Sequence, residues 1–462
     1  MYGGVEFRDY PDADNIGIMD HGCLPMIADM HKYGIRIDVP FLQSLSQRIA
    51  AIKEDNETIV GALIGNYQYR NSKGSYEPFK IGSRDHLSQL LFEELKIQGD
   101  TPIPRTPKDK RYEVSEEILE PFRESHPIVP EIIEWHSVEK LRNTYTDTLP
   151  LMVDSDSRLH TSFNATVAAT GRLSSSYPNL QNIPVRTKLG KEIRRAFIAG
   201  QNMALVSSDL AQIEMVWAAH RSQDPTMLSV FRKGEDIHTR TTCNVFGLDY
   251  PEMAALIKSV DDKTATPDQL SRYAYFKQFQ RLPCKTVGFG VLYGQTPEGL
   301  QSSLASDGVH WPIERCTKLI NVEFFGVYPG LLRMLERDWA TVKRYALCWD
   351  EFGRVRLVPE AKSVLRHIRE EGVRKAGNHP EQASAQGNIK LAMAELTDIY
   401  RRMNRSAPCR PLLQIHDQLI TEAHRSITQD VADIQAEILR NAVILSIPIN
   451  ASSDIGNCWA EL

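Results

Sequence analysis

Two aspartates in this sequence of 462 residues lie where strand-like apolar runs end or turn, and carboxylates so placed can bind hard cations. Asp209 lies near the carboxyl end of MALVSSDL, and Asp417 lies in a turn inside PLLQIHDQLITEA. On neighbouring strands of one sheet, the two carboxylates could hold two Mg²⁺ ions about 3.5–4 Å apart, as in two-metal phosphoryl transfer. Each aspartate also has a plainer interpretation, because Asp favours helix N-caps and turns. For Asp209 alone, the helix cap is the commoner role.

A second group of candidates lies in RYAYFKQFQRLPCKTVGFGVLYGQT, residues 272–296, which contains four cations and no acid. Four of its residues are spaced four apart: Arg281, Lys285, Phe289 and Tyr293. On a helix they would form one stripe, with cations to bind phosphates at one end and rings to stack a base at the other. The alternative is a solvated basic face whose rings enter the core. Pro283, Gly288 and Gly290 also weaken the helix.

A third group lies in TGRLSSSYPNLQNIPVRTKLGKEIRRAF, residues 170–197, where the single acid is Glu192. Six cations accompany it: Arg172, Arg186, Lys188, Lys191, Arg194 and Arg195. Asn179 and Gln181 add neutral hydrogen-bonding groups. Cations with amides suit a phosphate backbone and minor-groove acceptors, and a polar surface loop is the alternative.

The elements that must position these residues can be read from hydrophobic periodicity. Helical periodicity over 40–66, 86–97 and 115–148 predicts a helical lobe over 37–148, with a loop at 101–114. Further elements are expected downstream: strands within 158–175, a buried strand at 203–210, mostly helices over 226–348, a hairpin at 411–423, an amphipathic helix at 427–443 and a last strand at 447–455.

The composition is that of an ordinary globular protein with roughly two to four compact units. The sequence is 42% hydrophobic and 24% charged, which excludes disorder. It lacks a signal peptide, a membrane-spanning apolar run and any C-x-x-C pair, so a cytoplasmic, reducing location is expected. The net charge of −5 argues against a nucleic-acid partner only if charge is spread evenly. Residues 170–197 and 272–296 are locally basic.

The stretch TGRLSSSYPNLQNIPVR resembles the family A DNA polymerases, of which bacterial DNA polymerase I is the type member. Other segments follow in the family's order. SDLAQIEM (208–215) is similar to its motif A, R-x3-K-x3-F-x3-YG (281–294) to motif B, and QIHDQL (414–419) to motif C. GEDIHTRTTCNVFG (234–247) and RKAGNHPEQASAQGNIKLAM (374–393) also match, and the resemblance runs from LPMIADMHKYGIRID to IGNCWAEL.

The resemblance implies a mixed α+β fold with right-hand architecture: an antiparallel-sheet palm, helical fingers and a helical thumb. The domains it implies are an N-terminal segment leading into the palm (1–36), the thumb (37–150), the first part of the palm (151–225), the fingers (226–365) and the second part of the palm (366–462).

The activity that the resemblance implies is DNA-templated DNA synthesis in DNA replication or repair. Asp209 and Asp417, assisted by the carbonyl of Leu210, would hold two Mg²⁺ ions, for which Mn²⁺ can substitute. The primer 3′-hydroxyl would attack the α-phosphate of a dNTP and release pyrophosphate, with Lys285 as the third catalytic residue.

The resemblance also implies the residues that bind the two substrates. Arg281, Lys285 and His238 would grip the triphosphate, Phe289 would lie by the incoming base and sugar, and Tyr293 near the template base. Glu214 matches the residue that crowds the ribose 2′ position, and Gln212 would shape that pocket. Primer-template contacts are implied for seven further residues: Arg172, Asn179, Gln181, Arg374, Asn378, Gln382 and His416.

Several residues depart from the family's pattern. Leu210-Ala211 stand where motif A usually has Tyr-Ser, Val216 stands where it has Arg, and Gln418 replaces the Glu that commonly ends motif C. The connection between His238 and Arg281 is longer than in the bacterial enzyme, and Pro283 would delay or bend the motif B helix. These departures bear on rate and fidelity more than on function.

About twenty residues precede the first resembling segment, which is too few for a proofreading domain. No 3′–5′ exonuclease is therefore expected in this chain. The expected partners are primer-template DNA, dNTPs and a separate exonuclease or processivity factor, with no membrane and a monomeric state. The absent exonuclease and the divergent motifs favour a viral source. A catalytically silent DNA-binding or replisome-scaffold protein is the alternative, and a single-subunit RNA polymerase is a third that Glu214 argues against.

Overall fold

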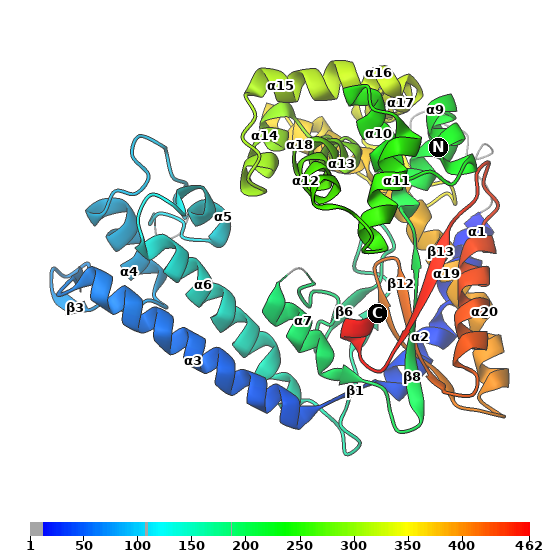
Figure 1. Ribbon diagram of the computed structural model, residues 1–462, viewed down its shortest axis with the longest axis horizontal. Helices are drawn as coiled ribbons and strands as arrows, with labels where there is room; N and C mark the ends of the chain where they lie inside the picture. The colour runs from blue at the N-terminus through cyan, green and yellow to red at the C-terminus, as the bar shows by residue number, and fades with distance from the viewer. Residues whose placement is uncertain (1–12, 107–109, 186) are drawn as a thin grey trace.

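The computed structural model describes residues 13–106, 110–185 and 187–462. A helical arm, a central antiparallel sheet with its helices, and a second helical body are visible in Figure 1. Arg186, one of the six cations of residues 170–197, lies outside the described residues, as do 107–109 of the expected loop.

The central sheet has four antiparallel strands in the order β11–β12–β8–β13. Their bounds are Cys409–Ile415 for β11, Gln418–His424 for β12, Met203–Leu210 for β8 and Ala451–Gly456 for β13. In β8, seven of the eight residues are buried and Asp209 is exposed, as expected of a central strand whose end reaches solvent. Helices α2 (Leu24–Tyr33), α19 (His379–Met403) and α20 (Thr428–Asn441) pack against this sheet.

The arm is built on two helices that lie side by side, α3 (Val39–Ile64) and α6 (Ile128–Leu141) (Figure 1). The side chain of Asp38 caps α3 by accepting a hydrogen bond from the backbone N–H of Phe41 at 2.9 Å. At the tip lie β2 (Gln68–Arg70), β3 (Tyr76–Pro78), α4 (Arg84–Ser88) and α5 (Glu116–Leu119). The tip has its own hydrophobic core, which includes Leu91 and Ile132 and is separate from the main core of the protein.

The first stretch of the sheet region holds short elements. These are α1 (Ala13–Gly22), β1 (Ile35–Ile37), β4 (Arg158–Leu159), β5 (Ser162–Asn164), β6 (Ser174–Ser176), α7 (Lys188–Arg195) and β7 (Phe197–Ile198). The strands β4, β1 and β7 form a small sheet, and β5 pairs with β6. The strands expected within 158–175 therefore exist, but they are short and interrupted by turns.

The second helical body follows α8 (Ile213–Ser222). Its helices are α9 (Pro225–Arg232), α10 (Ile237–Phe246), α11 (Tyr250–Asp261), α12 (Pro267–Tyr275), α13 (Leu282–Gly290), α14 (Pro297–Ser306), α15 (Ile313–Lys318), α16 (Phe325–Val327), α17 (Pro329–Tyr345) and α18 (Arg366–Gly377). A hairpin of β9 (Leu347–Trp349) and β10 (Val355–Leu357) precedes α18.

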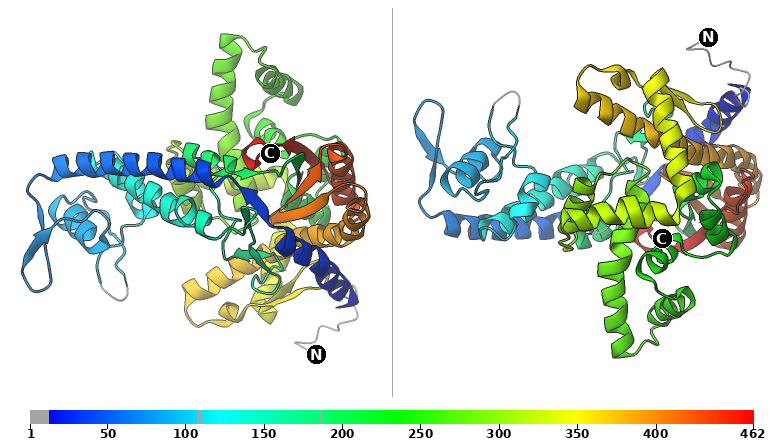
Figure 2. Two further views of the ribbon diagram at one scale, coloured as in Figure 1. Left: turned by 90° about the horizontal axis from the view of Figure 1, so that it is seen from below. Right: turned by 90° about the horizontal axis from the view of Figure 1, so that it is seen from above.

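The long connection expected between His238 and Arg281 forms a projection. Helix α11 packs beside α12, and α12 continues through a π-helical turn, Phe276–Arg281, into α13 (Figure 2). Pro283 therefore does not delay the helix. The wider π turn directly before it accommodates a residue that cannot donate a backbone hydrogen bond.

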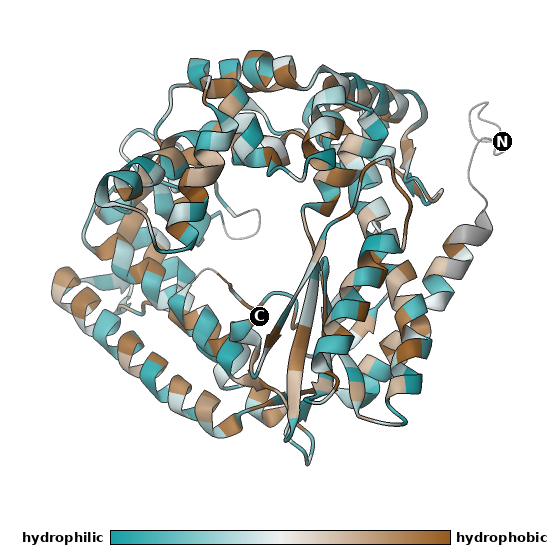
Figure 3. Ribbon diagram, turned by 45° about the vertical axis from the view of Figure 1, so that its right-hand side comes forward, coloured by the Kyte–Doolittle hydropathy of each residue, from teal (hydrophilic) through white to brown (hydrophobic). Residues whose placement is uncertain are grey.

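Most of the predicted elements are confirmed, including the helix over 40–66, the strand at 203–210 and the hairpin at 411–423. The helical periodicity over 115–148 corresponds to two helices, because turns near Pro127 separate α5 from α6. The hairpin of β2 and β3 was not predicted. Helices mix hydrophilic and hydrophobic residues along their length (Figure 3), and within the described ranges no helix is long and apolar enough to cross a membrane.

Candidate active site

The sheet brings Asp209 and Asp417 to the same end of two neighbouring strands. Asp209 of β8 pairs with Gln418 of β12, so Asp417 is one residue from the position opposite it. The backbone N–H of Leu210 donates a hydrogen bond to the carbonyl of Asp417 at 3.2 Å. The N-cap interpretation of Asp209 is wrong, since Gln212 occupies the N-cap position of α8 with no side-chain cap.

Both carboxyl groups have raised pKa values, chiefly because of burial, and a cation bound beside them would lower these values. Although Asp209 as a residue is exposed, desolvation of its carboxyl group by the surrounding residues raises its pKa to about 6, and the charge of Asp454 acts in the same direction. Burial also raises the pKa of Asp417 to about 7; nearby Arg172 opposes this, while Glu214 and Asp209 add to it. In the described ranges no cluster of three His, Cys, Asp or Glu side chains could hold a metal. Two carboxylates nevertheless fit Mg²⁺, which keeps several waters and takes substrate phosphates as ligands.

Glu214 is the centre of a hydrogen-bonded group beside these aspartates. It is buried in the first turn of α8 and accepts hydrogen bonds from Arg172 Nη2 at 2.7 Å and from the Tyr293 hydroxyl at 2.9 Å. Gln382 Nε2 of α19 donates to the same hydroxyl at 2.6 Å. The structure therefore brings together Glu214, Tyr293, Arg172 and Gln382, which come from four separate segments of the sequence.

Tyr293 does not continue the stripe of Arg281, Lys285 and Phe289, so the prediction of one four-residue helical face is wrong. Helix α13 ends at Gly290, and the backbone N–H of Tyr293 donates to the carbonyl of Gly290 at 3.0 Å in the following turn. A turn here is favoured by Gly294, whose positive φ of 67° suits glycine. The turn lets the Tyr293 hydroxyl reach Glu214.

Arg281 is anchored on the start of helix α10. Its Nη2 donates to Asp236 Oδ1 at 2.9 Å and its Nε to Thr239 Oγ1 at 3.1 Å. Gln212 Nε2 donates to Asp236 Oδ2 at 2.9 Å. Burial acts to raise the pKa of Asp236, but hydrogen bonds from Thr239 and the charge of Arg281 lower it to about 2. Asp236 is therefore ionised at neutral pH.

His238 lies close to the two predicted phosphate-binding cations. Its ring packs against Phe289 with centroids 4.9 Å apart, and the Nζ of Lys285 lies 6.0 Å from the Phe289 centroid. Burial lowers the pKa of His238 to about 4, and although Asp236 opposes this, Arg281 and Lys285 reinforce it. The ring is thus neutral at pH 7. Among the described residues its Nε2 has no hydrogen-bond partner.

The residues predicted to contact the primer-template come from two regions of the fold, which the hydrogen bonds of Glu214 and Tyr293 connect through Arg172 and Gln382. Gln181 Nε2 donates to the carbonyls of Leu173 and Gln414, both at 3.1 Å, which ties its loop to the strand before His416. Asn179 is exposed nearby, and its Oδ1 accepts from the backbone N–H of Gln181 at 3.0 Å. The second group lies where α18 meets α19: Arg374, Asn378 and Gln382.

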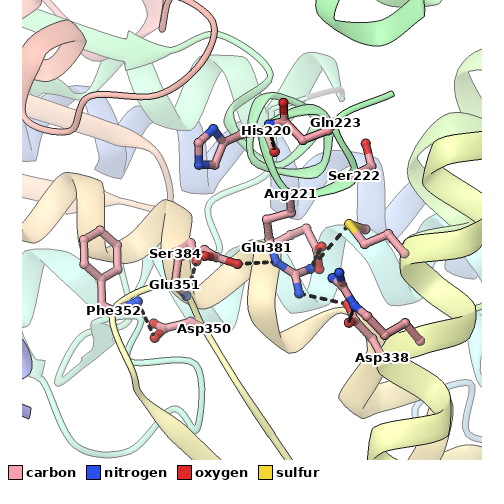
Figure 4. Close-up of polar contacts among 12 residues, drawn as sticks. His220, Arg221, Ser222, Gln223, Asp338, Asp350, Glu351, Phe352, Glu381 and Ser384 are labelled. Atoms are coloured by element: carbon pink, nitrogen blue, oxygen red, sulfur yellow. Dashed lines mark hydrogen bonds and ion pairs between the residues drawn. The ribbon is translucent and has the colours of Figure 1, made fainter. Parts of the chain in front are cut away.

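Sequence reasoning missed a buried ion-pair cluster at the other end of α8 (Figure 4). Arg221 donates to Asp338 of α17 at 2.9 Å, to Glu351 at 2.8 Å and to Glu381 of α19. Its side chain is 7% exposed and that of Glu381 is fully buried. This Arg221 cluster joins α8, α17, α19 and the β9–β10 turn. The sequence offers only one weak signal for it: Glu381 is the single acid in RKAGNHPEQASAQGNIKLAM.

The chain matches the family model described as DNA polymerase family A over residues 60–461. Thermostable DNA polymerase I of Thermus caldophilus is 37% identical over 435 residues, covering 94% of this chain and 46% of that protein. DNA polymerase I of Deinococcus radiodurans is 34% identical over 437 residues, covering 94% and 41%. The chain spans less than half the length of these relatives.

A similar solved structure is the POL domain of Pol1 from M. smegmatis in complex with DNA primer-template and dNTP. It is 29% identical, has a TM-score of 0.79, and the match covers 96% of this chain and 70% of that chain. The expected α+β fold of palm, fingers and thumb is thereby confirmed, while the domain boundaries and residue roles stay predictions. By the family model and by its fold, this chain belongs to DNA polymerase family A.

Proposed function

We propose that this chain is a DNA-templated DNA polymerase that extends a primer by nucleotidyl transfer and releases pyrophosphate. The observation that carries the proposal is the placement of Asp209 near the end of β8 and of Asp417 in the turn just before the neighbouring strand β12, within a family A domain. The primer-template and dNTP in the similar solved structure support the substrate class. DNA and dNTPs are therefore the proposed partners.

The proposed metal ligands are Asp209, Asp417 and the carbonyl of Leu210. The family is metal-dependent, and two bound Mg²⁺ ions would supply Lewis-acid stabilisation of charge on the reacting oxygens. The chain's own residues then have positioning roles. Arg281 and Lys285 hold the triphosphate as cations, and His238 adds a neutral ring N–H donor beside them.

Sugar selection is assigned to Glu214. Its carboxylate is held by Arg172 and by the Tyr293 hydroxyl, so it cannot swing away from a nucleotide bound over β8. A ribose 2′-hydroxyl would meet this fixed, buried group, whereas a deoxyribose would not. Seven residues are proposed to contact minor-groove acceptors, which are alike in all Watson–Crick pairs. They are Arg172, Asn179, Gln181, Arg374, Asn378, Gln382 and His416. Synthesis would therefore be independent of sequence.

Primer extension on a template of defined sequence tests the proposal. Wild-type protein with Mg²⁺ should add only the complementary dNMP, and Asp209→Asn should bind the same DNA without extending it. Asp454→Asn is the matched control, because Asp454 lies on β13 close enough to influence the pKa of Asp209 but is no proposed ligand. Failure of the wild type to extend, or DNA binding alone in every variant, would contradict the proposal and favour a scaffold.

A further inference from the structure

The carboxylate of Asp236 is fixed by four hydrogen bonds from three elements. Oδ1 accepts from the backbone N–H and from the hydroxyl of Thr239, both at 2.7 Å, and from Arg281 Nη2 at 2.9 Å. Oδ2 accepts from Gln212 Nε2 at 2.9 Å. The backbone N–H of Asp236 donates to the Tyr250 hydroxyl at 2.8 Å. This is more anchoring than an N-cap of α10 requires.

Arg281 is held through one edge of its guanidinium group. Nε binds Thr239 Oγ1 and Nη2 binds Asp236 Oδ1, so the planar group is fixed in direction as well as in place. Among the described residues the structure records no partner for Nη1. The side chain is 26% exposed, so part of it is accessible to a ligand. Lys285 follows one helical turn later on α13, and His238 follows Asp236 in α10.

We propose that Asp236 is a positioning residue that presets Arg281 for the triphosphate of an incoming nucleotide. The inference deepens the proposed function and rests on it. An arginine that must be ordered on binding loses side-chain freedom, and one already held by a rigid carboxylate does not. Asp236 therefore acts on nucleotide affinity through Arg281, without contacting the nucleotide itself. Through Gln212 it also fixes this arginine relative to the turn that follows Asp209.

The test is steady-state single-nucleotide addition by Asp236→Asn. Asparagine keeps an oxygen for the Thr239 donors and can bond to Gln212 through its amide, but it removes the charge that holds Arg281. KM for dNTP should rise about 3- to 10-fold, from the freedom that Arg281 regains, with kcat within about 2-fold. Asp249→Asn is the matched control: Asp249 starts the neighbouring helix α11, and its side chain makes no cap hydrogen bond.

A double-mutant cycle separates this role from simple helix capping. In the Arg281→Gln background, Asp236→Asn should change KM by less than about 2-fold, because the residue through which it acts is gone. An unchanged or lower KM in Asp236→Asn, or an equal KM increase in both backgrounds, would overturn the inference. Wild-type protein that fails to extend primers would instead contradict the proposed function, so the two failures are distinguishable.

Discussion

Arg221 carries a buried positive charge at the end of α8, and its replacement by methionine tests what that charge contributes. Methionine keeps much of the length and apolar volume of the side chain. It leaves the carboxylates of Asp338, Glu351 and Glu381 without their shared partner, and Glu381 is fully buried. Removing one partner of a buried ion pair costs about 3–5 kcal/mol, because the remaining charge is uncompensated. We expect Arg221→Met to lower the free energy of unfolding by that amount at pH 8.

The cost should depend on pH through Glu381. Burial raises the pKa of Glu381, while Arg221 acts to lower it, so loss of Arg221 raises this pKa further. A carboxyl group whose pKa is higher in the folded than in the unfolded protein binds its proton more tightly in the folded protein. It contributes stability at pH values below the unfolded pKa, about 4.3, and this contribution is lost as pH rises through the folded pKa. The deficit of Arg221→Met relative to wild type should therefore be smaller at pH 5 than at pH 8.

Urea titrations at both pH values measure this deficit. Arg366→Met is the matched control, because Arg366 pairs with Glu370 on an exposed helix face, where an ion pair contributes little to stability. Adding Glu381→Gln to Arg221→Met should restore part of the lost stability by removing the stranded charge. A deficit below about 1 kcal/mol at both pH values, or no recovery in the double variant, would refute the reasoning.

Three further predictions concern single side chains. Burial raises the pKa of Asp350 to about 6, so wild-type stability falls as pH rises from about 4 to 6. The difference in unfolding free energy between Asp350→Asn and wild type should therefore shift in favour of the variant by about 2–3 kcal/mol between pH 4 and 7.5 in urea titrations. A difference that stays constant with pH would contradict this. Glu214→Ala should raise the ratio of ribonucleotide to deoxyribonucleotide incorporation, and an unchanged ratio would disprove the steric role. Tyr293→Phe removes the hydroxyl bound by Glu214 and Gln382, and should lower the unfolding free energy by about 1–2 kcal/mol in thermal or urea unfolding.

The elements were largely predictable because their signals are local. Alternation and apolar runs located β8 and the β11–β12 hairpin, and helical periodicity located α3 and α20. Strand pairing could not be read this way, since Asp209 and Asp417 meet only through the register of β8 with β12. The resemblance, and not their spacing, placed them together.

The predictions that were wrong or missing also concern features that tertiary structure decides. Asp209 resembles a helix cap in sequence, but its strand continues to Leu210 and α8 begins only after Gln212. Tyr293 leaves the helical stripe because glycines end α13 and the buried Glu214 offers its hydroxyl an acceptor. Arg221 and Glu381 were missed because their pairing depends on tertiary packing of α8 against α19.

The most direct test of the account is single-turnover nucleotide addition by Asp417→Asn, with primer-template binding measured on the same protein. Asparagine preserves the turn between β11 and β12 but removes one of the two proposed metal-binding charges. The rate of addition should fall at least about 1,000-fold, because several kcal/mol of charge stabilisation are lost, while DNA affinity stays within about 3-fold of wild type. Addition at a rate near that of wild type would contradict the assignment of Asp209 and Asp417 as the catalytic pair.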